Sequence, residues 1–377
     1  MKANRFELRD IMFFPLSLLY GFVVGFRNFL FNIKVLRSVE FKLPIISVGN
    51  ISVGGTGKTP HTEYLIKLLK DDYKIATLSR GYKRLTNGFI LADNDSNFEQ
   101  IGDEPAQMKK KFSDIEIAVD GNRVRGVKRL LEERKDTQVV LLDDAYQHRY
   151  INPGLNILLI DNNNPIDEDR LLPLGRLRES ASELHRANII IITKCSPNIK
   201  PIEQRLLEKR FKQYPYQKIY FTTLSYNEPM PVFEGVKKVN NTLKISENTH
   251  VLLITGIANS KPLKSHIQIL TPFITELSFP DHYSYSSLDI QYIIEKFELI
   301  DNKDKVIITT EKDAMRFQHK ADIDDKIKAA MFYIPVEVTF LNGEEKTFNH
   351  FILNFVRNNK PDSLLYKKYE KKVSTMV

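Results

Sequence analysis

PIISVGNISVGGTGKTP, residues 44–60, is the stretch of sequence from which the fold can be predicted. Its apolar beginning has the composition of a buried strand, and a glycine-rich turn, a Lys–Thr pair and a helical pattern follow it. A strand, a glycine-rich loop and a helix in this order are typical of a phosphate-binding loop, or P-loop. The loop residues expected to bind a nucleotide are Ser52, Val53, Gly54, Gly55, Thr56, Gly57, Lys58 and Thr59.

The chemistry of phosphate binding explains the residue types in this loop. Glycines let backbone N–H groups approach phosphate oxygens without a Cβ clash. Lys58 would contact the β- and γ-phosphates of a nucleotide, and the Thr59 hydroxyl would bind Mg²⁺. Ser52 stands where the consensus has its first glycine, so a fortuitous glycine-rich turn is the alternative interpretation. Thr193–Ser196 lacks the aspartate of a guanine-reading loop, which favours ATP over GTP.

Two consecutive aspartates end another apolar run, QVVLL at residues 138–142. A P-loop enzyme needs a carboxylate at the end of a neighbouring strand to hold Mg²⁺ or its water. In open parallel sheets, ligands bind at the carboxyl ends of the strands. We therefore expect Asp143 and Asp144 to form a metal site with Thr59, with ATP and Mg²⁺ as the cofactors. An aspartate pair that only opens a turn is the alternative.

The composition of the 377-residue chain excludes several classes of protein. Hydrophobic residues make up 42% and charged residues 27%, which excludes a disordered chain, a collagen-like repeat and a polytopic membrane protein. A single cysteine, Cys195, excludes an internal disulfide framework and a cysteine-based zinc site. The net charge of +8 favours an anionic partner: nucleic acid, an anionic lipid surface or a phosphorylated substrate. We expect no nucleic-acid partner, because the sequence has no RNP, helix-turn-helix or zinc-finger signature.

The N-terminal region contains an uncharged apolar run, IMFFPLSLLYGFVVGF at residues 11–26. A helix over this run would be about 24 Å long, which is marginal for crossing the roughly 30 Å hydrocarbon core of a bilayer. Lys34, Arg37 and Lys42 follow it, as in an interfacial anchor on an anionic leaflet. We expect residues 1–36 to form a membrane-associated helix, with a buried core helix as the alternative.

The rest of the chain alternates short apolar runs with amphipathic stretches. This pattern predicts an α/β fold: a P-loop NTPase-like, mostly parallel sheet sandwiched by helices. Turn residues cluster at Asn227–Pro231, which predicts a P-loop domain over 37–226 and a second, smaller α/β domain over 227–377. The C-terminal tail could pack back on the first domain. The predicted strands are Ile45–Val48, Lys74–Ser79, Ile115–Val119, Gln138–Leu142, Asn156–Ile160, Asn188–Thr193, Lys218–Thr223, Val251–Thr255, Phe273–Phe279, Lys305–Thr310 and Met331–Val336.

Several short motifs, taken together and in order, resemble the tetraacyldisaccharide 4'-kinase (lipid A 4'-kinase) family. They are VGNISVGGTGKTP (48–60), SRGYKR (79–84), GDEP (102–105), LDDAYQHR (142–149), LLPLGRLRE (171–179), FPDH (279–282) and TEKDAMRF (310–317). The resemblance implies a phosphotransferase that moves the γ-phosphate of ATP to the 4'-hydroxyl of a tetraacyldisaccharide 1-phosphate, giving the lipid IVA type of precursor in lipid A biosynthesis.

The resemblance also implies where the protein works. It implies an enzyme on the cytoplasmic face of a bacterial inner membrane, bound peripherally or monotopically, whose partners are the glycolipid and the membrane surface. We expect a monomer. A P-loop ATPase or GTPase that acts as a switch or delivery factor at the membrane is the alternative function.

An Asp–His pair beside the γ-phosphate is a further implication of the resemblance. The matching positions are Asp103 in GDEP and His282 in FPDH, and with Lys58 they are the expected catalytic residues. Asp103 would be the carboxylate that accepts the proton of the attacking hydroxyl, and His282 its orienting or proton-sharing partner. Residue types alone favour a different role, because an aspartate before Glu104–Lys111 is a common helix cap.

Other polar residues in loops are candidates for contacts with the substrates. Arginine suits bidentate contact with phosphate, whereas the alternatives are a solvated basic loop, turn chemistry or an ion pair that shapes the site. The candidates are Arg80, Lys83, Asp120, Arg123, Gln147, Arg178 and Glu179. Glu311 and Asp313, which follow another predicted strand, either face the cleft or begin a helix.

Overall fold

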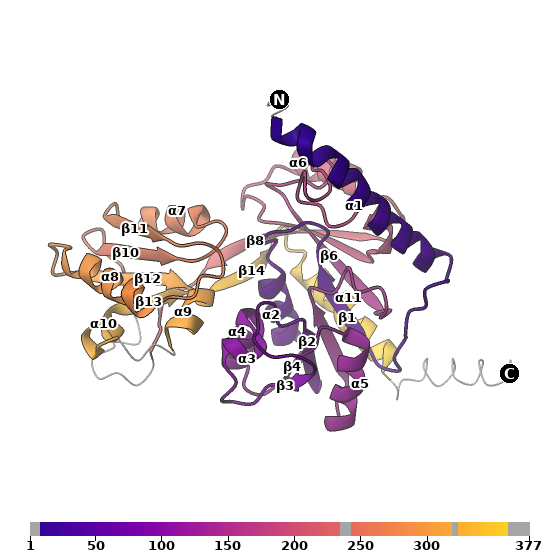
Figure 1. The fold of residues 1–377 in the computed structure, drawn as a ribbon, viewed down its shortest axis with the longest axis horizontal. Coiled ribbons are helices and arrows are strands. Elements are labelled where there is room, and N and C mark those ends of the chain that lie inside the picture. Colours follow the sequence, from indigo (N-terminus) through magenta and orange to yellow (C-terminus); the bar gives the residue numbers. More distant parts are fainter. Residues whose placement is uncertain (1–7, 234–242, 319–322, 361–377) are drawn as a thin grey trace.

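The computed structural model describes residues 8–233, 243–318 and 323–360 and arranges them around two sheets (Figure 1). The larger sheet has nine strands and the smaller has five. Most neighbouring strands are parallel, as expected for a chain built from strand–helix–strand units. The predicted α/β class is confirmed.

The strands of the larger sheet form where the sequence has its apolar and β-branched runs. They are β1 Ile45–Gly49, β2 Ile75–Ser79, β3 Ile90–Leu91, β4 Glu116–Val119, β5 Val139–Asp143, β6 Leu155–Asp161, β7 Ile189–Thr193, β8 Lys218–Tyr226 and β14 Val336–Phe340. Across the sheet they lie in the order β14-β8-β7-β6-β1-β5-β2-β4-β3. The P-loop strand β1 is therefore central, with β5 on one side and β6 on the other.

Helices cover both faces of this sheet, which explains why its strands are apolar on both sides. They are α2 Lys58–Leu69, α3 Phe98–Ile101, α4 Asp103–Lys111, α5 Arg123–Glu133, the short 3₁₀ helix η1 Ala181–Arg186, α6 Pro201–Phe211 and α11 Glu345–Asn359. Ile46 and Val48 of β1 share a core cluster with side chains of α2, α4 and α11. Ile45 points to the other face and shares a cluster with α5.

The smaller sheet has its own helices and its own buried clusters. Its strands are β9 Met230–Pro231, β10 His250–Thr255, β11 Ile274–Ser278, β12 Lys305–Thr310 and β13 Met331–Ile334, in the order β11-β10-β12-β13-β9. Its helices are α7 Lys261–Leu270, α8 Ser287–Glu298, α9 Glu311–Phe317 and α10 Asp325–Ala330. Helix α9 packs against α4 of the larger unit, so the two units meet at this helix pair (Figure 1).

Two adjacent antiparallel strands connect the two units. β8 leads out of the larger sheet and β14 leads back into it, with Val336 paired to Tyr226 and Phe340 to Thr222 (Figure 1). The elements of the smaller sheet thus lie between these strands in sequence. β14 and α11 fall in the region expected to form the second domain, 227–377, but they pack on the larger sheet.

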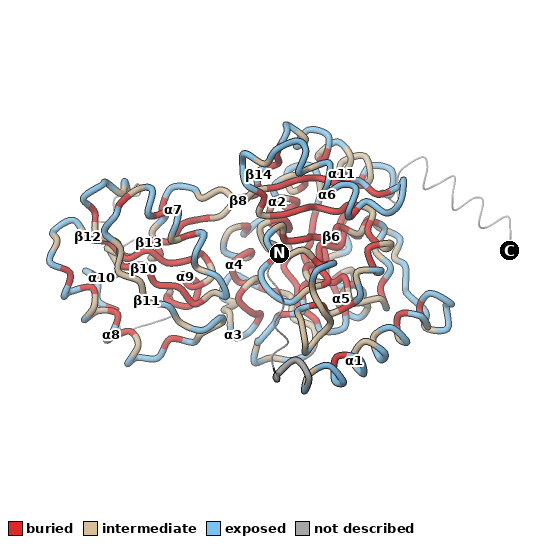
Figure 2. The backbone as a smooth tube through the Cα atoms, turned by 90° about the horizontal axis from the view of Figure 1, so that it is seen from above, coloured by how far each residue is buried: buried red, intermediate tan, exposed pale blue. Residues whose placement is uncertain are grey.

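The N-terminal helix α1, Leu8–Asn32, lies along one side of the larger unit (Figure 2). Among the described helices it is the one long and apolar enough to cross a membrane by length and composition, over Met12–Asn32 with a mean hydropathy of 1.4. Only 11% of the apolar window is buried, and Phe22 is 71% exposed. Most of the surface of α1 is therefore exposed, and the alternative of a buried core helix is wrong.

Candidate active site

The P-loop connects β1 to α2 and adopts a conformation that its glycines allow. Gly54 and Gly57 have positive φ angles of 109° and 89°, a region that favours glycine. Helix α2 begins at Lys58, with Gly57 as its N-cap. Within the described residues no side chain caps this helix end, so its first N–H groups and its positive dipole end are available to an anion.

A buried asparagine directly after β1 holds the loop in place. The side-chain amide of Asn50 donates to Thr56 Oγ1 at 2.9 Å, and its Oδ1 accepts hydrogen bonds from Lys58 Nζ at 3.4 Å and from Arg178. At the end of β7, Thr193 Oγ1 donates to the carbonyl oxygen of Thr56 at 3.0 Å. Asn50 is absent from the predicted site, although it lies within the motif that predicted the loop.

The two aspartates predicted to bind metal lie at the carboxyl end of β5, next to the P-loop strand. Asp143 is buried and accepts a hydrogen bond from Thr62 Oγ1 at 3.3 Å. A carboxylate oxygen of Asp144 lies 3.7 Å from Lys58 Nζ and 3.0 Å from a guanidinium nitrogen of Arg178. The two carboxylates therefore have different surroundings, one enclosed and one paired with cations.

These surroundings separate the pKa values of the two carboxyl groups. Burial and the charge of Asp144 raise the pKa of Asp143 to about 7. Burial would also raise the pKa of Asp144, but the charges of Lys58 and Arg178 outweigh it and hold that pKa at about 2. At neutral pH Asp144 is ionised, whereas Asp143 is partly protonated. A cation bound at this place would displace the proton of Asp143.

The groups at the end of β5 fit Mg²⁺ held together with a nucleotide. Mg²⁺ is usually bound by one or two carboxylates, with phosphate oxygens and water completing the coordination. Asp143, Asp144 and the hydroxyl of Thr59 would supply that protein share. In the part of the chain that the structure describes, no group of three or more His, Cys, Asp or Glu side chains is placed to hold a metal ion. The chain thus offers a partial coordination shell rather than an all-protein cage.

The structure brings together the predicted Asp–His pair from the two units. Asp103 Oδ2 accepts a hydrogen bond from Nδ1 of His282 at 2.8 Å. His282 lies in the loop after β11 with a positive φ of 61°, and its backbone N–H donates to the carbonyl oxygen of Gly256. Gly102 is the N-cap of α4, and Asp103 is its first helical residue. The capping role that residue types alone favoured for Asp103 is therefore wrong.

A lysine on α9 fixes the tautomer of this histidine. Lys312 Nζ lies 2.9 Å from Nε2 of His282, and an ammonium group can only donate. Nε2 is therefore the acceptor, and Nδ1 carries the hydrogen that is donated to Asp103. Lys312 also lies 3.4 Å from Glu104 and 3.6 Å from Asp281. Lys312 lies within the TEKDAMRF motif, but it was not predicted as a site residue.

The Asp103 carboxylate is surrounded by donors. Burial alone would raise its pKa, but hydrogen bonds from His282 and Arg316 outweigh that effect and lower the pKa to about 2. The charge of the neighbouring residue Glu104 also contributes to the raised pKa of Asp143. The Asp–His pair and the aspartates of β5 therefore belong to one electrostatic neighbourhood.

A buried cluster of three charges also joins the two units. Lys111 Nζ, at the end of α4, lies 2.6 Å from Glu63 on α2 and 2.9 Å from Glu311 on α9. Burial and the charge of Glu311 raise the pKa of Glu63 to about 7. Glu311, expected either to face the cleft or to begin a helix, is the first residue of α9 and pairs with Lys111.

A cavity of about 270 Å³ lies between α1 and the carboxyl ends of the central strands. Its positive charge comes from three arginines, one of them on α1, and Asp144, at the end of β5, also lines it. Its lining residues are Tyr20, Val24, Arg27, Arg80, Asp144, Gln147, His148, Arg178 and Glu179. Four of the predicted substrate residues, Arg80, Gln147, Arg178 and Glu179, thus surround one cavity.

The other three predicted substrate residues lie outside the lining of this cavity. Lys83 is exposed beside the ring of Tyr82. Asp120 is buried and binds the Arg125 guanidinium through both carboxylate oxygens. Arg123 is buried and donates to the backbone carbonyl oxygens of Asp120 and Asp143. Arg123 therefore holds the strand end that carries the aspartate pair.

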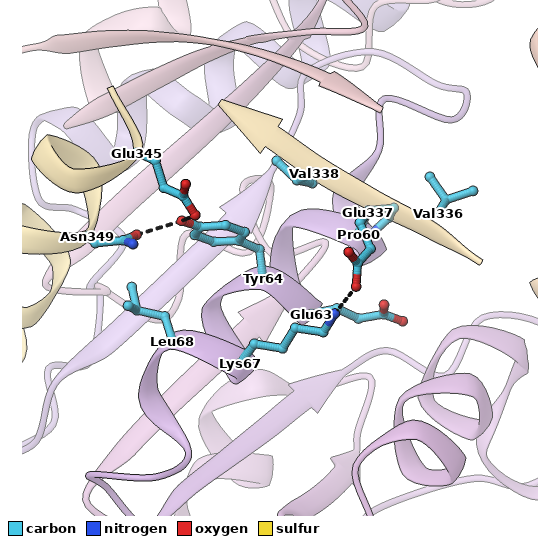
Figure 3. A pocket seen from close by; sticks show the side chains of 10 residues that line it. All are labelled: Pro60, Glu63, Tyr64, Lys67, Leu68, Val336, Glu337, Val338, Glu345 and Asn349. Carbon is cyan, nitrogen blue, oxygen red and sulfur yellow. Dashed lines mark hydrogen bonds and ion pairs between the residues drawn. The ribbon is translucent and has the colours of Figure 1, made fainter. Parts of the chain in front are cut away.

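A second cavity, of about 330 Å³, lies between α2, β14 and α11 (Figure 3). Apart from Glu63, its polar side chains are bound to one another: the Tyr64 hydroxyl lies 3.0 Å from Glu345 and 2.7 Å from Asn349, and Lys67 pairs with Glu337. None of the predicted site residues lines it. The candidate active site is therefore the region around the P-loop, the aspartates of β5 and the Asp103–His282 pair.

Comparison with known proteins shows what this chain is similar to. The family model described as tetraacyldisaccharide-1-P 4'-kinase matches residues 9–357. A protein named tetraacyldisaccharide 4'-kinase from Bacteroides thetaiotaomicron is 46% identical over 357 residues, which cover 93% of this chain and 94% of that protein. One of the same name from Parabacteroides distasonis is 48% identical over 345 residues, covering 91% and 93%. A crystal structure of LpxK from Aquifex aeolicus in complex with ATP superposes with a TM-score of 0.71 at 27% identity, covering 93% of this chain and all of that chain.

Proposed function

Because this chain belongs to the tetraacyldisaccharide-1-P 4'-kinase family, we propose a role for each part of its cleft in the reaction of that family. The protein is a lipid A 4'-kinase that uses ATP to phosphorylate the 4'-hydroxyl of a tetraacyldisaccharide 1-phosphate. The observation that carries the division of roles is the Asp103–His282 hydrogen bond, which joins the two units.

The P-loop and the aspartates of β5 form the proposed ATP site. Residues 52–59 would bind the phosphates through backbone N–H groups at the start of α2, and Lys58 would neutralise charge on the β- and γ-phosphates. Mg²⁺ held by Asp143, Asp144 and Thr59 would supply further charge neutralisation at the transferring group. Support for this assignment comes from the positive φ angles of the loop glycines and from the parallel pairing of β5 with β1.

The Asp103–His282 pair is the proposed acceptor of the hydroxyl proton. Both carboxylate oxygens of Asp103 accept hydrogen bonds, and the lone pair of His282 Nε2 accepts one from Lys312. Lys312 would release Nε2 when the hydroxyl binds, because Glu104 lies 3.4 Å from its ammonium group. The 4'-hydroxyl would lose its proton to Nε2 while its oxygen bonds to the γ-phosphorus and the bond to the β-phosphate oxygen breaks. Asp103 would stabilise the imidazolium, so the pair shares the proton and the ring nitrogen receives it.

The cavity beside α1 is the proposed site for the disaccharide head group. Arg27, Arg80 and Arg178 could bind the 1-phosphate, because guanidinium groups suit bidentate contact with phosphate. Tyr20 and Val24 of α1 line the same cavity, which would place acyl chains along this helix. Asp144, one of the two proposed Mg²⁺ ligands, also lines this cavity. An acceptor site for phosphoryl transfer must lie next to the metal and the γ-phosphate in this way.

The exposed face of α1 is the proposed contact with the membrane. Leu18 is 59% exposed and Phe22 71% exposed, and lipid would cover such side chains favourably. The helix is tied to the site by Asn28, whose amide donates to Glu179 at 3.2 Å. We place the enzyme on the cytoplasmic face of the inner membrane, where a membrane-bound lipid and cytoplasmic ATP are both available.

Phosphoryl transfer to the lipid tests these assignments. The protein would be incubated in detergent micelles with Mg²⁺, radiolabelled ATP and the tetraacyldisaccharide 1-phosphate, and the labelled lipid measured. Lys58→Ala should abolish transfer, whereas Lys67→Ala, a control on the same helix, should not. Retained transfer by the Lys58 variant would contradict the P-loop assignment. Hydrolysis of ATP without a labelled lipid would instead favour a nucleotide-dependent switch.

A further inference from the structure

A buried arginine on α9 reaches across the boundary between the two units to Asp103. Arg316 Nε donates to Asp103 Oδ1 at 3.1 Å, and its Nη2 donates to Oδ2 at 2.5 Å. The Arg316 side chain is 3% exposed and that of Asp103 8% exposed. The predicted site did not include Arg316, although Arg316 is the next-to-last residue of the TEKDAMRF motif.

The guanidinium is itself anchored in the smaller unit. Its Nη1 donates to Asp313 Oδ1 at 2.9 Å, and Asp313 is fully buried. The other carboxylate oxygen of Asp313 accepts from the backbone N–H of Gly256 at 2.8 Å and from Thr310 Oγ1 at 2.7 Å. Asp313 was expected either to face the cleft or to begin a helix. It lies in the first turn of α9 and binds Arg316, so it does not face the cleft.

The same glycine connects this anchor to the catalytic histidine. The carbonyl oxygen of Gly256 accepts from the backbone N–H of His282, while its N–H is bound by Asp313. One short segment after β10 therefore positions both partners of Asp103: His282 directly and Arg316 through Asp313. A Cβ at this glycine would lie 2.8 Å from Asp313 Oδ1, so the close approach requires glycine.

A buried ion pair of this kind is poorly explained by stability alone. Removing a guanidinium and a carboxylate from water is costly, and a pair of well-packed apolar residues of similar size is often equally stable or more stable. The bidentate geometry, however, fixes both oxygens of one carboxylate in a single orientation. The arrangement is better explained by a need to aim Asp103.

We propose that Arg316 is a positioning residue for the catalytic pair. It holds the Asp103 carboxylate in the orientation that receives the His282 N–H, and it makes this alignment depend on contact between the two units. The inference rests on the proposed roles of Asp103 and His282. Arg316 binds Asp103 and Asp313 and lies outside the lining of the cavity beside α1, so it would act through Asp103.

The test combines Arg316→Met and Arg316→Lys with Asp103→Asn, singly and together. Arg134→Met, which removes an arginine from a surface pair with Glu116, is the control. For each variant, lipid phosphorylation gives kcat, the KM for ATP and the pH dependence of kcat. Binding of ATP and the urea midpoint report whether a variant is folded.

Arg316→Met should lower kcat by roughly 100-fold and change the KM for ATP by less than about 3-fold, because the P-loop is untouched. Without the guanidinium the pKa of Asp103 rises, so the acid limb of the kcat profile should move to higher pH. Arg316→Lys should restore part of the loss. In the Asp103→Asn background, Arg316→Met should change kcat by less than about 3-fold, because the two residues act as a unit.

Two results would overturn the inference: additive losses in the double variant, or a reduced kcat with an unmoved acid limb. If Arg316→Met does not fold, the Arg316→Lys variant supports the same two comparisons. A wild-type kcat for Asp103→Asn would be a separate result, because it would refute the proposed role of Asp103 rather than that of Arg316.

Discussion

Replacing Glu63 with glutamine should make the free energy of unfolding less dependent on pH. Glu63 and Glu311 face a single Lys111 in a buried cluster that joins α2, α4 and α9. Because the two carboxylates share one ammonium group, one of them can bind a further proton, and the cluster titrates as a unit. Burial and the charge of Glu311 raise the pKa of Glu63 from 4.5 to about 7.

The size of the effect follows from this shift. Below pH 4.5 the group is protonated in both the folded and unfolded states, so it contributes nothing. Between pH 4.5 and 7 only the unfolded state loses the proton, so the free energy of unfolding falls as the pH rises. Above pH 7 the loss is complete, at about 3 kcal/mol for a shift of this size. Most of this loss accrues between pH 5 and pH 8.

The assay compares wild type and Glu63→Gln by urea unfolding from pH 5 to pH 8. The free energy of unfolding of the variant, relative to wild type, should rise by about 2–3 kcal/mol over this range. Circular dichroism and tyrosine fluorescence should be followed together, because a chain with two units need not unfold in one step. Glu116→Gln, at a partly exposed pair with Arg134, controls for the chemical change. A difference for Glu63→Gln that stays flat with pH would refute the reasoning.

Three further predictions concern the metal, the membrane and the acceptor. Asp143→Asn should lower Mg²⁺-dependent transfer to labelled lipid at least roughly 100-fold. In urea unfolding, the gain in free energy of unfolding of this variant over wild type should be larger at pH 8 than at pH 5. Leu18→Asn with Phe22→Asn should weaken binding to anionic vesicles by roughly 100-fold or more in co-sedimentation, whereas Leu299→Asn, at an equally exposed site on the smaller unit, should not. Arg80→Met should raise the KM for the lipid about 10-fold and leave the KM for ATP unchanged; equal changes in both would contradict its place in the acceptor cavity.

Local patterns predicted the parts of the site that lie close together in sequence. Residues 44–60 carry the strand, the loop and the helix start within one stretch, and the aspartate pair follows its own apolar run. These features are local because a strand end and a helix N-terminus together bind phosphate.

Contacts between distant segments could not be predicted in this way. The resemblance to a family pointed to Asp103 and His282, but no local pattern shows that they touch or that Arg316 completes the group. The two possible roles of Asp103, as helix cap and as catalytic carboxylate, share the same residue type at the same helix start. The cap role fails because α4 begins one residue earlier, with Gly102 as its N-cap. The contacts of Asp103 with His282 and Arg316 arise only from the packing of the two units.

Local pattern also says little about which sheet an element joins. An amphipathic helix such as α11 predicts a buried face but not the surface that covers it. Here Phe348 and Ile352 enter the core beside β1 and α2. The pairing of β14 with β8 places α11 there, and that pairing is set by chain topology rather than by either strand's composition.

The position of β14 at the far end of the chain has a consequence for synthesis. On the ribosome β8 emerges long before β14, so the edge of the larger sheet stays open while the whole smaller unit is being made. An open edge strand is a template for pairing with other chains. A nascent chain stalled after β13 should therefore be prone to aggregate, and release of residues 336–359 should act as the closing step that gives the edge strand its own partner.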